Sequence, residues 1–251
     1  MPLFITKRME TAIEIKGLKK SFGDNEVLKD INLTVEKGEN LVVLGRSGEG
    51  KSVTIKCIVG LLVPDDGTLN VLGHEVTQLN EDELDELRKK IGFLFQQAAL
   101  YDSMTVGENL AFPLSRVLDM KDKNEIHEKV MDMLGNVGLE DAADKMPSSL
   151  SGGMKKRIGL ARTLIVQPEI VLYDEPTTGL DPITSREISE LILQMQKKYK
   201  TTSIIITHDM ECARITADRI VVMSDGKYIA EGTFDSLQKH EDPFIRSFFN
   251  A

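Results

Sequence analysis

An octapeptide in the first quarter of the chain constrains the fold more than any other feature. The sequence Gly-Arg-Ser-Gly-Glu-Gly-Lys-Ser occupies residues 45–52 and fits the spacing G-x-x-x-x-G-K-[ST]. The apolar run Leu41–Leu44 precedes it, and a stretch of helical character, Lys51–Val59, follows. A strand, a glycine-rich loop and a helix in this order are typical of a loop that cradles phosphate groups. We therefore expect the chain to fold around such a unit.

The residue types of this loop suit a phosphate ligand. Glycines let the backbone curl so that several N–H groups point at phosphate oxygens, and the helix N-terminus adds partial positive charge. Lys51 would supply a point charge to the β- and γ-phosphates, and the Ser52 hydroxyl would bind Mg²⁺. Glu49 would repel phosphates, so we expect its side chain to point to solvent. The residues predicted to bind Mg–ATP are Gly45, Arg46, Ser47, Gly48, Glu49, Gly50, Lys51, Ser52 and Val53.

Short apolar segments alternate with amphipathic helical stretches along the chain, which favours an α/β fold with a mostly parallel sheet. The expected strands are Leu41–Leu44, Ile91–Phe95, Ile170–Tyr173, Ser203–Thr207 and Ile220–Met223. Segments 12–16, 32–36 and 227–231 alternate in polarity and lie near turn residues, so we expect antiparallel strands there, at an edge. Residues 104–146 have mostly helical character and predict a helical insertion in the core.

Two carboxylates end one of the apolar strands. The segment Ile170–Tyr173 runs directly into Asp174 and Glu175. Adjacent residues on a strand point in opposite directions, so one carboxylate can address Mg²⁺ while the other addresses an attacking water. We expect Asp174 near the metal and Glu175 as the general base or the residue that positions the water. Two surface acids at a turn are the alternative, which the apolar strand before them argues against.

Two further elements carry less information on their own. Ser151, Gly152 and Gly153 open a helical stretch, and this arrangement can bind a second anion, although a capped turn is its commoner meaning. His208 follows the apolar segment 203–207. A lone histidine at a strand end is usually structural. Beside the phosphate loop and the two carboxylates, a contact to the γ-phosphate is the better hypothesis.

Composition excludes several classes of protein. The net charge of −9 and a pI of about 5.1 argue against a general nucleic-acid binder, which usually carries a basic face. The two cysteines, Cys57 and Cys212, have no metal-like spacing and indicate reduced thiols in a cytosolic protein. No apolar run approaches the roughly 18–20 residues of a membrane helix, so other chains would have to span any membrane at which this protein acts.

Taken in order along the chain, these motifs resemble those of the ATPase subunits of ABC transporters. The residues that carry the resemblance are the loop at 45–52, Gln96, Leu150–Met154, Asp174–Glu175, Gly179–Asp181 and His208. The resemblance implies a RecA-like P-loop NTPase fold, with an antiparallel β subdomain at the edge and a helical subdomain inserted at about residues 98–156. It implies one ATPase domain over residues 11–240, followed by a helical tail over residues 241–251.

The same resemblance implies a head-to-tail dimer with two ATP molecules at the interface. Lys51 and Ser52 of one copy and Ser151–Gly153 of the other would hold each ATP. Gln96 would complete the Mg²⁺ shell and relay nucleotide state to the helical insertion, and Asp181 would cross the interface.

The resemblance also places residues around the adenine base. Phe22 falls where the family stacks an aromatic ring on adenine, and Val27 would pack beside it. For Phe22, a position in the core is the alternative.

A closer resemblance is to the ATPase of the bacterial Mla-type phospholipid transporter. It rests on the Gly45–Gly48 tetrapeptide, on residues 98–106 and 108–114, and on Met154 where most of the family has Gln. It implies a cytoplasmic subunit, peripheral on the inner face of the bacterial inner membrane. Its partners would be an integral-membrane permease, a periplasmic MCE lipid-binding protein and, in some members, a STAS-domain subunit.

Other hypotheses stay open. An importer ATPase for amino acids or other small solutes is the first alternative. A soluble ABC protein acting on ribosomes or DNA, and a nucleotide-dependent scaffold without hydrolysis, fit the single acidic cassette and its intact Glu175 and His208 less well. In the tail, Phe244, Phe248 and Phe249 have helical spacing, and they would pack either on their own domain or on a second copy.

Overall fold

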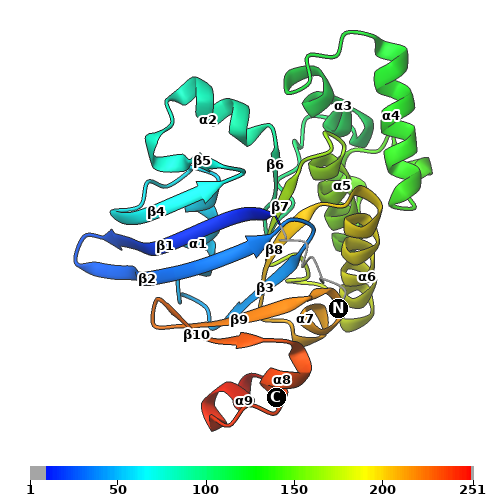
Figure 1. Ribbon diagram of the computed structural model, residues 1–251. Helices are drawn as coiled ribbons and strands as arrows, with labels where there is room; N and C mark the ends of the chain where they lie inside the picture. The colour runs from blue at the N-terminus through cyan, green and yellow to red at the C-terminus, as the bar shows by residue number, and fades with distance from the viewer. Residues whose placement is uncertain (1–9, 250–251) are drawn as a thin grey trace, which may run out of the picture.

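The computed structural model describes residues 10–249, and a six-stranded sheet lies at its centre (Figure 1). The strand order is β10-β9-β3-β8-β7-β6, with β10 antiparallel and the other strands parallel. The bounds are β3 Asn40–Gly45, β6 Ile91–Leu94, β7 Ile170–Asp174, β8 Thr202–Thr207, β9 Arg219–Ser224 and β10 Lys227–Gly232. The prediction of a mostly parallel α/β sheet is confirmed, and β10 adds the antiparallel edge expected at 227–231.

The register of this sheet brings three strand ends to one edge. Leu44 of β3 pairs with Thr207 of β8, and Asp174 of β7 pairs with Ile206. Carboxyl ends of parallel strands meet at the same side of a sheet, where open α/β folds bind ligands. The phosphate loop, the acidic pair and His208 all follow directly on these ends.

The N-terminal antiparallel strands form a second, four-stranded sheet of order β2-β1-β4-β5. The bounds are β1 Thr11–Phe22, β2 Asn25–Glu36, β4 Asp66–Val71 and β5 His74–Glu75. Strands β1 and β2 are much longer than the expected segments, because the turn at Gly23–Asp24 continues their pairing to Phe22 and Asn25. Strand β4 was not predicted from the sequence, and its polar residues Asp66, Thr68 and Asn70 explain why.

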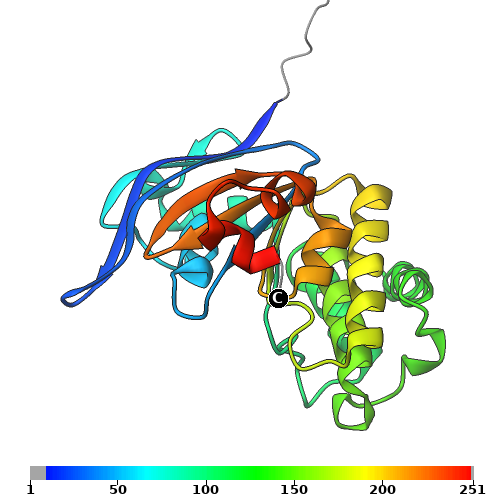
Figure 2. The same ribbon diagram turned by 90° about the horizontal axis from the view of Figure 1, so that it is seen from below.

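Helix α1, Lys51–Ile58, lies between the two sheets, so the molecule is layered (Figures 1 and 2). Ile55 and Ile58 pack into one apolar core with Leu41 and Val43 of β3 and with the inner face of β1. The alternate strand residues, such as Val42 and Tyr173, face a second core that is covered by helices. Alternation along β3 and β7 thus buries both faces of the sheet.

The second face of the large sheet is covered by α5 Gly152–Leu164, α6 Pro182–Tyr199 and α7 Met210–Thr216 (Figure 1). Helix α6 was not predicted from the sequence, although Asp181 caps it and Pro182 opens it. Helices α3 Val106–Arg116 and α4 Lys123–Asn136 pack with α5 away from the central sheet, and α2 Glu81–Arg88 lies beside the small sheet. The charged α2 begins with a capping box of Asn80 and Glu83.

The C-terminal segment packs beside β10 through α8 Phe234–Gln238 and α9 Pro243–Phe249 (Figure 2). Phe249 is buried, and its ring meets that of Phe234 edge-on at 5.3 Å. Within the described residues the tail therefore packs on its own domain, while residues 250–251 of the expected tail lie outside them. No helix in residues 10–249 has the length and hydropathy needed to cross a membrane.

Candidate functional site

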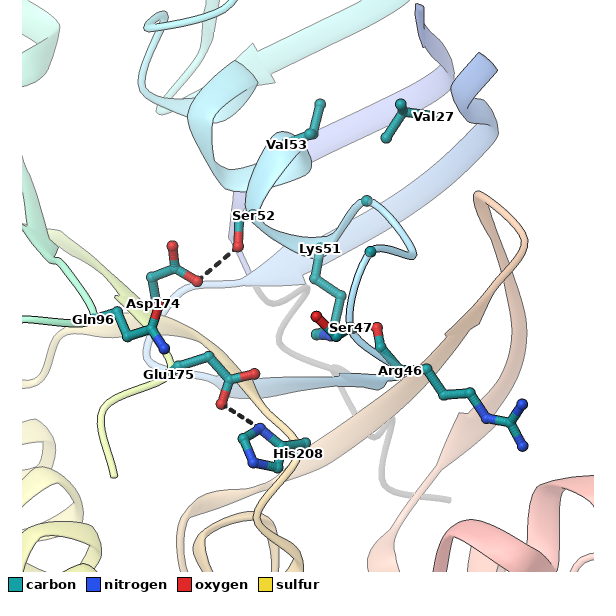
Figure 3. A pocket seen from close by; sticks show the side chains of 12 residues that line it. Val27, Arg46, Ser47, Lys51, Ser52, Val53, Gln96, Asp174, Glu175 and His208 are labelled. Atoms are coloured by element: carbon teal, nitrogen blue, oxygen red, sulfur yellow. Dashed lines mark hydrogen bonds and ion pairs between the residues drawn. The ribbon is translucent and has the colours of Figure 1, made fainter. Parts of the chain in front are cut away.

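A pocket of about 630 Å³ opens where β3, β7 and β8 end (Figure 3). This volume is in the usual range for small-ligand sites. The pocket brings together twelve of the residues predicted for nucleotide, metal or catalysis, from segments that are far apart in the sequence. They are Val27, Arg46, Ser47, Gly48, Gly50, Lys51, Ser52, Val53, Gln96, Asp174, Glu175 and His208.

The loop between β3 and α1 depends on its glycines. Gly48 and Gly50 have φ angles of 87° and 105°, which a residue with a Cβ adopts only under strain. Gly45 has no room for a side chain, because a Cβ there would lie 2.7 Å from the carbonyl oxygen of Met223. The motif spacing thus has a steric basis, with the loop curled tightly over the end of the sheet and leading into the N-terminus of α1.

Lys51 is the cation at the base of the pocket and is only 6% exposed. Its ammonium group donates hydrogen bonds to the carbonyl oxygens of Gly45 and Arg46, at 2.8 and 2.9 Å. Burial lowers the pKa of Lys51, and the carboxylate charge of Glu175 acts in the opposite direction. A buried ammonium with only neutral acceptors in contact is well suited to receive an anionic ligand.

Ser52 and Asp174 link the loop to the acidic strand end. The Ser52 hydroxyl donates to Asp174 Oδ1 at 2.8 Å, and Gln96 lies beside them in the pocket (Figure 3). Hydroxyl, carboxylate and amide oxygens are the ligands that Mg²⁺ takes beside phosphate groups. This donor set fits Mg²⁺, and residues 10–249 contain no cluster of three His, Cys, Asp or Glu side chains that suggests another metal.

Glu175 and His208 form a second pair of side chains in the pocket (Figure 3). His208 Nδ1 lies 2.8 Å from Glu175 Oε2, which also accepts a 3.2 Å hydrogen bond from the Thr178 hydroxyl. The Glu175 side chain is 15% exposed, whereas that of His208 is 66% exposed. Glu175 has a φ of 53°, an unfavourable conformation for a residue with a Cβ. Its backbone N–H is held by the carbonyl oxygen of Ile206, at 2.9 Å.

Several predicted residues lie outside this pocket. Phe22 ends β1 with 48% of its surface exposed, so the alternative position in the core is wrong. Glu49 does not line the pocket, and its side chain is only partly in solvent. It is half-buried, and its carboxylate accepts the backbone N–H of Asp225. Arg46 does line the pocket, but its side chain extends away from Lys51, and its guanidinium lies 5.8 Å from the centre of the Phe244 ring (Figure 3).

The other glycine-rich motif also lies outside the pocket. Ser151 is exposed and caps α5, since its hydroxyl accepts the backbone N–H of Met154 at 3.3 Å. Gly152 is exposed as well, and Gly153 packs so closely on Thr184 that a Cβ would lie 2.7 Å from its methyl group. Asp181 caps α6, and hydrogen bonds, first from the Thr184 hydroxyl, lower its pKa.

One buried cation was missed in the sequence. Lys156 is 6% exposed, and its ammonium donates to the carbonyl oxygens of Gln96 and Glu175, the latter at 3.3 Å. Burial lowers its pKa. The signal was available, because Lys156 precedes Leu160 and Leu164 by four and eight residues and so shares the apolar face of a helix. Lys156 ties the start of α5 to two segments of the pocket.

The comparisons with known proteins agree with this geometry. Residues 28–178 match the family model described as ABC transporter. A protein of Mycobacterium leprae, "probable ribonucleotide transport ATP-binding protein mkl", is 40% identical over 97% of this chain and 70% of its own length. The "methionine import ATP-binding protein MetN" of Clostridium tetani is 41% identical over 90% of this chain and 70% of its own length.

Solved structures give the same result. The ATP-binding cassette MJ0796, in a dimeric post-hydrolysis state bound to ADP and Pi, superposes with a TM-score of 0.81. It is 32% identical, and the match covers 88% of this chain and 98% of that one. The protein cbiO1 from Clostridium perfringens, part of the ABC transporter complex cbiONQ, has a TM-score of 0.82 at 28% identity, over 95% and 98% of the two chains. This chain belongs to the ABC transporter family, as an ATP-binding and ATP-hydrolysing subunit.

Proposed function

We propose that Mg–ATP binds with its phosphates on the loop at 45–52, and that its hydrolysis drives a phospholipid transporter of bacterial membranes. The observation that carries the nucleotide part is the meeting of Lys51, Ser52, Asp174, Glu175 and His208 at one edge of the parallel sheet. On binding, phosphate oxygens would replace the carbonyl oxygens of Gly45 and Arg46 as hydrogen-bond acceptors of the Lys51 ammonium. Val27 would pack beside the adenine, and the exposed ring of Phe22 would stack on it.

Ser52, Asp174 and Gln96 would hold Mg²⁺. The ion would neutralise charge on the phosphate oxygens as it builds up. The hydroxyl–carboxylate contact already places the Ser52 and Asp174 oxygens 2.8 Å apart, so both can face the same small cation.

Glu175 is the proposed general base or water-positioning residue. Its carboxylate is fixed from two sides, by His208 and by Thr178, which leaves Oε1 free of these contacts. A carboxylate held in one orientation can accept a proton from a water in line with the γ-phosphate, or align that water. His208 would thus orient Glu175 through Nδ1 and turn Nε2 towards the γ-phosphate.

A second copy of the chain would complete the site. The exposed Ser151–Gly153 motif would close on the γ-phosphate bound to the partner copy, with Asp181 at the interface. The dimeric cassette among the similar structures supports this arrangement. We propose one ATPase domain over residues 11–240, followed by a helical tail over residues 241–251. Within the domain, residues from about 98 to 156 would form the helical unit that couples Gln96 to a permease, on the cytoplasmic face of the membrane.

The transported molecule is supported by fewer observations than the binding of Mg–ATP. The loop tetrapeptide and residues 98–114 support phospholipid, together with an MCE protein and a STAS-domain subunit as partners. Import of a small solute such as an amino acid is the second candidate, because methionine importers are as similar in sequence as the first relatives.

Co-purification separates the two candidates. The tagged chain is purified from membranes of its own host in mild detergent, and the bound subunits and lipids are identified by mass spectrometry. Phospholipid transport predicts a permease with an MCE-domain protein, and ATPase activity stimulated by phospholipid in the reconstituted complex. A solute-binding protein in the complex, with stimulation by an amino acid instead, would contradict it.

A further inference from the structure

Glu49 belongs to the phosphate loop but does not line the pocket, and the proposed site gives it no contact with the nucleotide. An acid beside a triphosphate repels it, yet this carboxylate is ordered, since Oε2 accepts the backbone N–H of Asp225. Asp225 lies in the turn between β9 and β10, 176 residues further along the chain. The phosphate loop is thereby bonded to a hairpin turn that does not itself line the pocket.

That turn is held in place by β2. Asp225 Oδ1 accepts from the Lys29 ammonium at 2.5 Å, and the backbone N–H of Lys29 donates to the Gly226 carbonyl at 3.0 Å. Gly226 approaches β2 so closely that a Cβ would lie 2.5 Å from the Val27 carbonyl oxygen. The Glu49 carboxylate is therefore bonded to a turn that β2 itself holds in place.

The same stretch of β2 also packs directly on the phosphate loop. A Cβ on Gly50 would lie 2.8 Å from Leu28 Cδ2 and 3.0 Å from the Val27 carbonyl oxygen. Val27 in turn lines the pocket. Three segments, 27–29, 49–50 and 224–226, form a closed junction that we call the loop junction, and the Glu49 hydrogen bond closes it.

We propose that Glu49 is a positioning residue with two opposed effects on nucleotide affinity. Its hydrogen bond holds the phosphate loop, through the loop junction, in the curled shape that binds phosphates, and so raises affinity. Its negative charge lies two residues from Lys51 and repels the phosphates, and so lowers affinity. This inference rests on the nucleotide site proposed above and assigns a function to the residue that this site left unexplained.

Two neutral variants separate the effects. Glu49→Gln keeps an acceptor oxygen of the same reach and removes the charge, whereas Glu49→Ala removes both. The difference between the two variants reports the hydrogen bond, and the difference between wild type and Glu49→Gln reports the charge. Glu128 on α4 is exposed and distant from the pocket, so Glu128→Gln and Glu128→Ala form the matched control pair.

The affinity for a fluorescent ATP analogue is measured at equilibrium in the presence of Mg²⁺, at low and at high salt. Glu49→Gln is expected to bind about three- to tenfold more tightly than Glu49→Ala, the ratio typical of one hydrogen bond. It is also expected to bind about two- to fivefold more tightly than wild type, an advantage that shrinks in high salt because salt screens the charge. The two Glu128 variants should bind like wild type.

Hydrogen exchange without nucleotide provides an independent readout. Amides of residues 46–50 should exchange faster in Glu49→Ala than in wild type, and at the wild-type rate in Glu49→Gln. Equal affinity and equal loop exchange in the two Glu49 variants would overturn the positioning role. If wild type bound no ATP analogue, the proposed nucleotide site would fall, while the exchange comparison would still decide the role of Glu49.

Discussion

The loop Gly45–Ser52 and the motif Ser151–Gly153 are both glycine-rich, and both open a helix. The first follows a buried strand, and the neighbouring strands deliver Asp174, Glu175 and His208 to the same edge. The second follows the 3₁₀ turn Pro147–Ser149, lies at the surface, and has its serine engaged in capping its own helix.

The difference shows which part of the proposed site a single chain assembles by itself. Parallel strand register fixes the side chains around the phosphate loop, so this part of the proposed site is assembled in a single copy. Nothing in the described residues brings Ser151–Gly153 to it. Changes on the loop side should therefore alter nucleotide binding or the chemical step in each copy, and changes on the Ser151 side should alter only what requires two copies.

The largest effect is expected from Glu175→Gln. The variant keeps the side-chain size and removes the proposed base, so kcat for ATP hydrolysis should fall by about 10²- to 10⁴-fold while ATP binding is retained. Phosphate release measured under saturating Mg–ATP checks this, with Glu86→Gln on the exposed face of α2 as control. Unchanged phosphate release would remove Glu175 from the mechanism.

An intermediate effect is expected from Ser151→Ala, which addresses the other side of the comparison. Turnover should fall by about tenfold, since one hydrogen bond to a charged phosphate is lost. ATP affinity, measured at concentrations where the chain is monomeric, should stay within about twofold of wild type. Ser149→Ala is the matched control, because within residues 10–249 the Ser149 hydroxyl donates only to the Met146 carbonyl. A weakened monomer affinity would show that Ser151 acts in cis.

The smallest effect is expected from Lys156→Met, because Lys156 connects α5, the helix that Ser151 caps, to the pocket at the phosphate loop. The aliphatic stem is kept, but the carbonyl groups of Gln96 and Glu175 lose their donor. We expect kcat to fall by about three- to tenfold with little change in ATP affinity, because only the orientation of Glu175 is disturbed. Lys155→Met, one residue earlier, is the control. Equal activity of the two variants would make the Lys156 contacts purely structural.

Much of this architecture can be predicted from the sequence, because strands buried in a parallel sheet appear as runs of apolar residues. Residues 41–44, 170–173 and 203–207 predicted β3, β7 and β8, and the motifs predicted Lys51, Ser52, Asp174, Glu175 and His208 in the pocket. Strand β4 escaped because it pairs with β1 while half of its residues are polar. Its pairing partner, and not its composition, makes it a strand.

The environments of Glu49 and Lys156 escaped for a different reason. Glu49 is bonded to a turn 176 residues away, and Lys156 to carbonyl groups 60 and 19 residues away. Hydrophobic periodicity reports the face on which a residue lies, but not the partner that meets it across the fold. Such contacts depend on tertiary structure alone.

In the proposed mechanism the phosphate loop forms half of a nucleotide site, and a second copy of the chain completes it. Analytical ultracentrifugation of Glu175→Gln, with and without Mg–ATP, tests it most directly, because blocked hydrolysis preserves the bound state. We expect monomers without nucleotide and dimers with Mg–ATP, and we expect Lys51→Ala or Ser151→Ala, added to this variant, to weaken the dimer. A second copy would not complete the site if the chain bound Mg–ATP but stayed monomeric at every concentration at which its native complex forms.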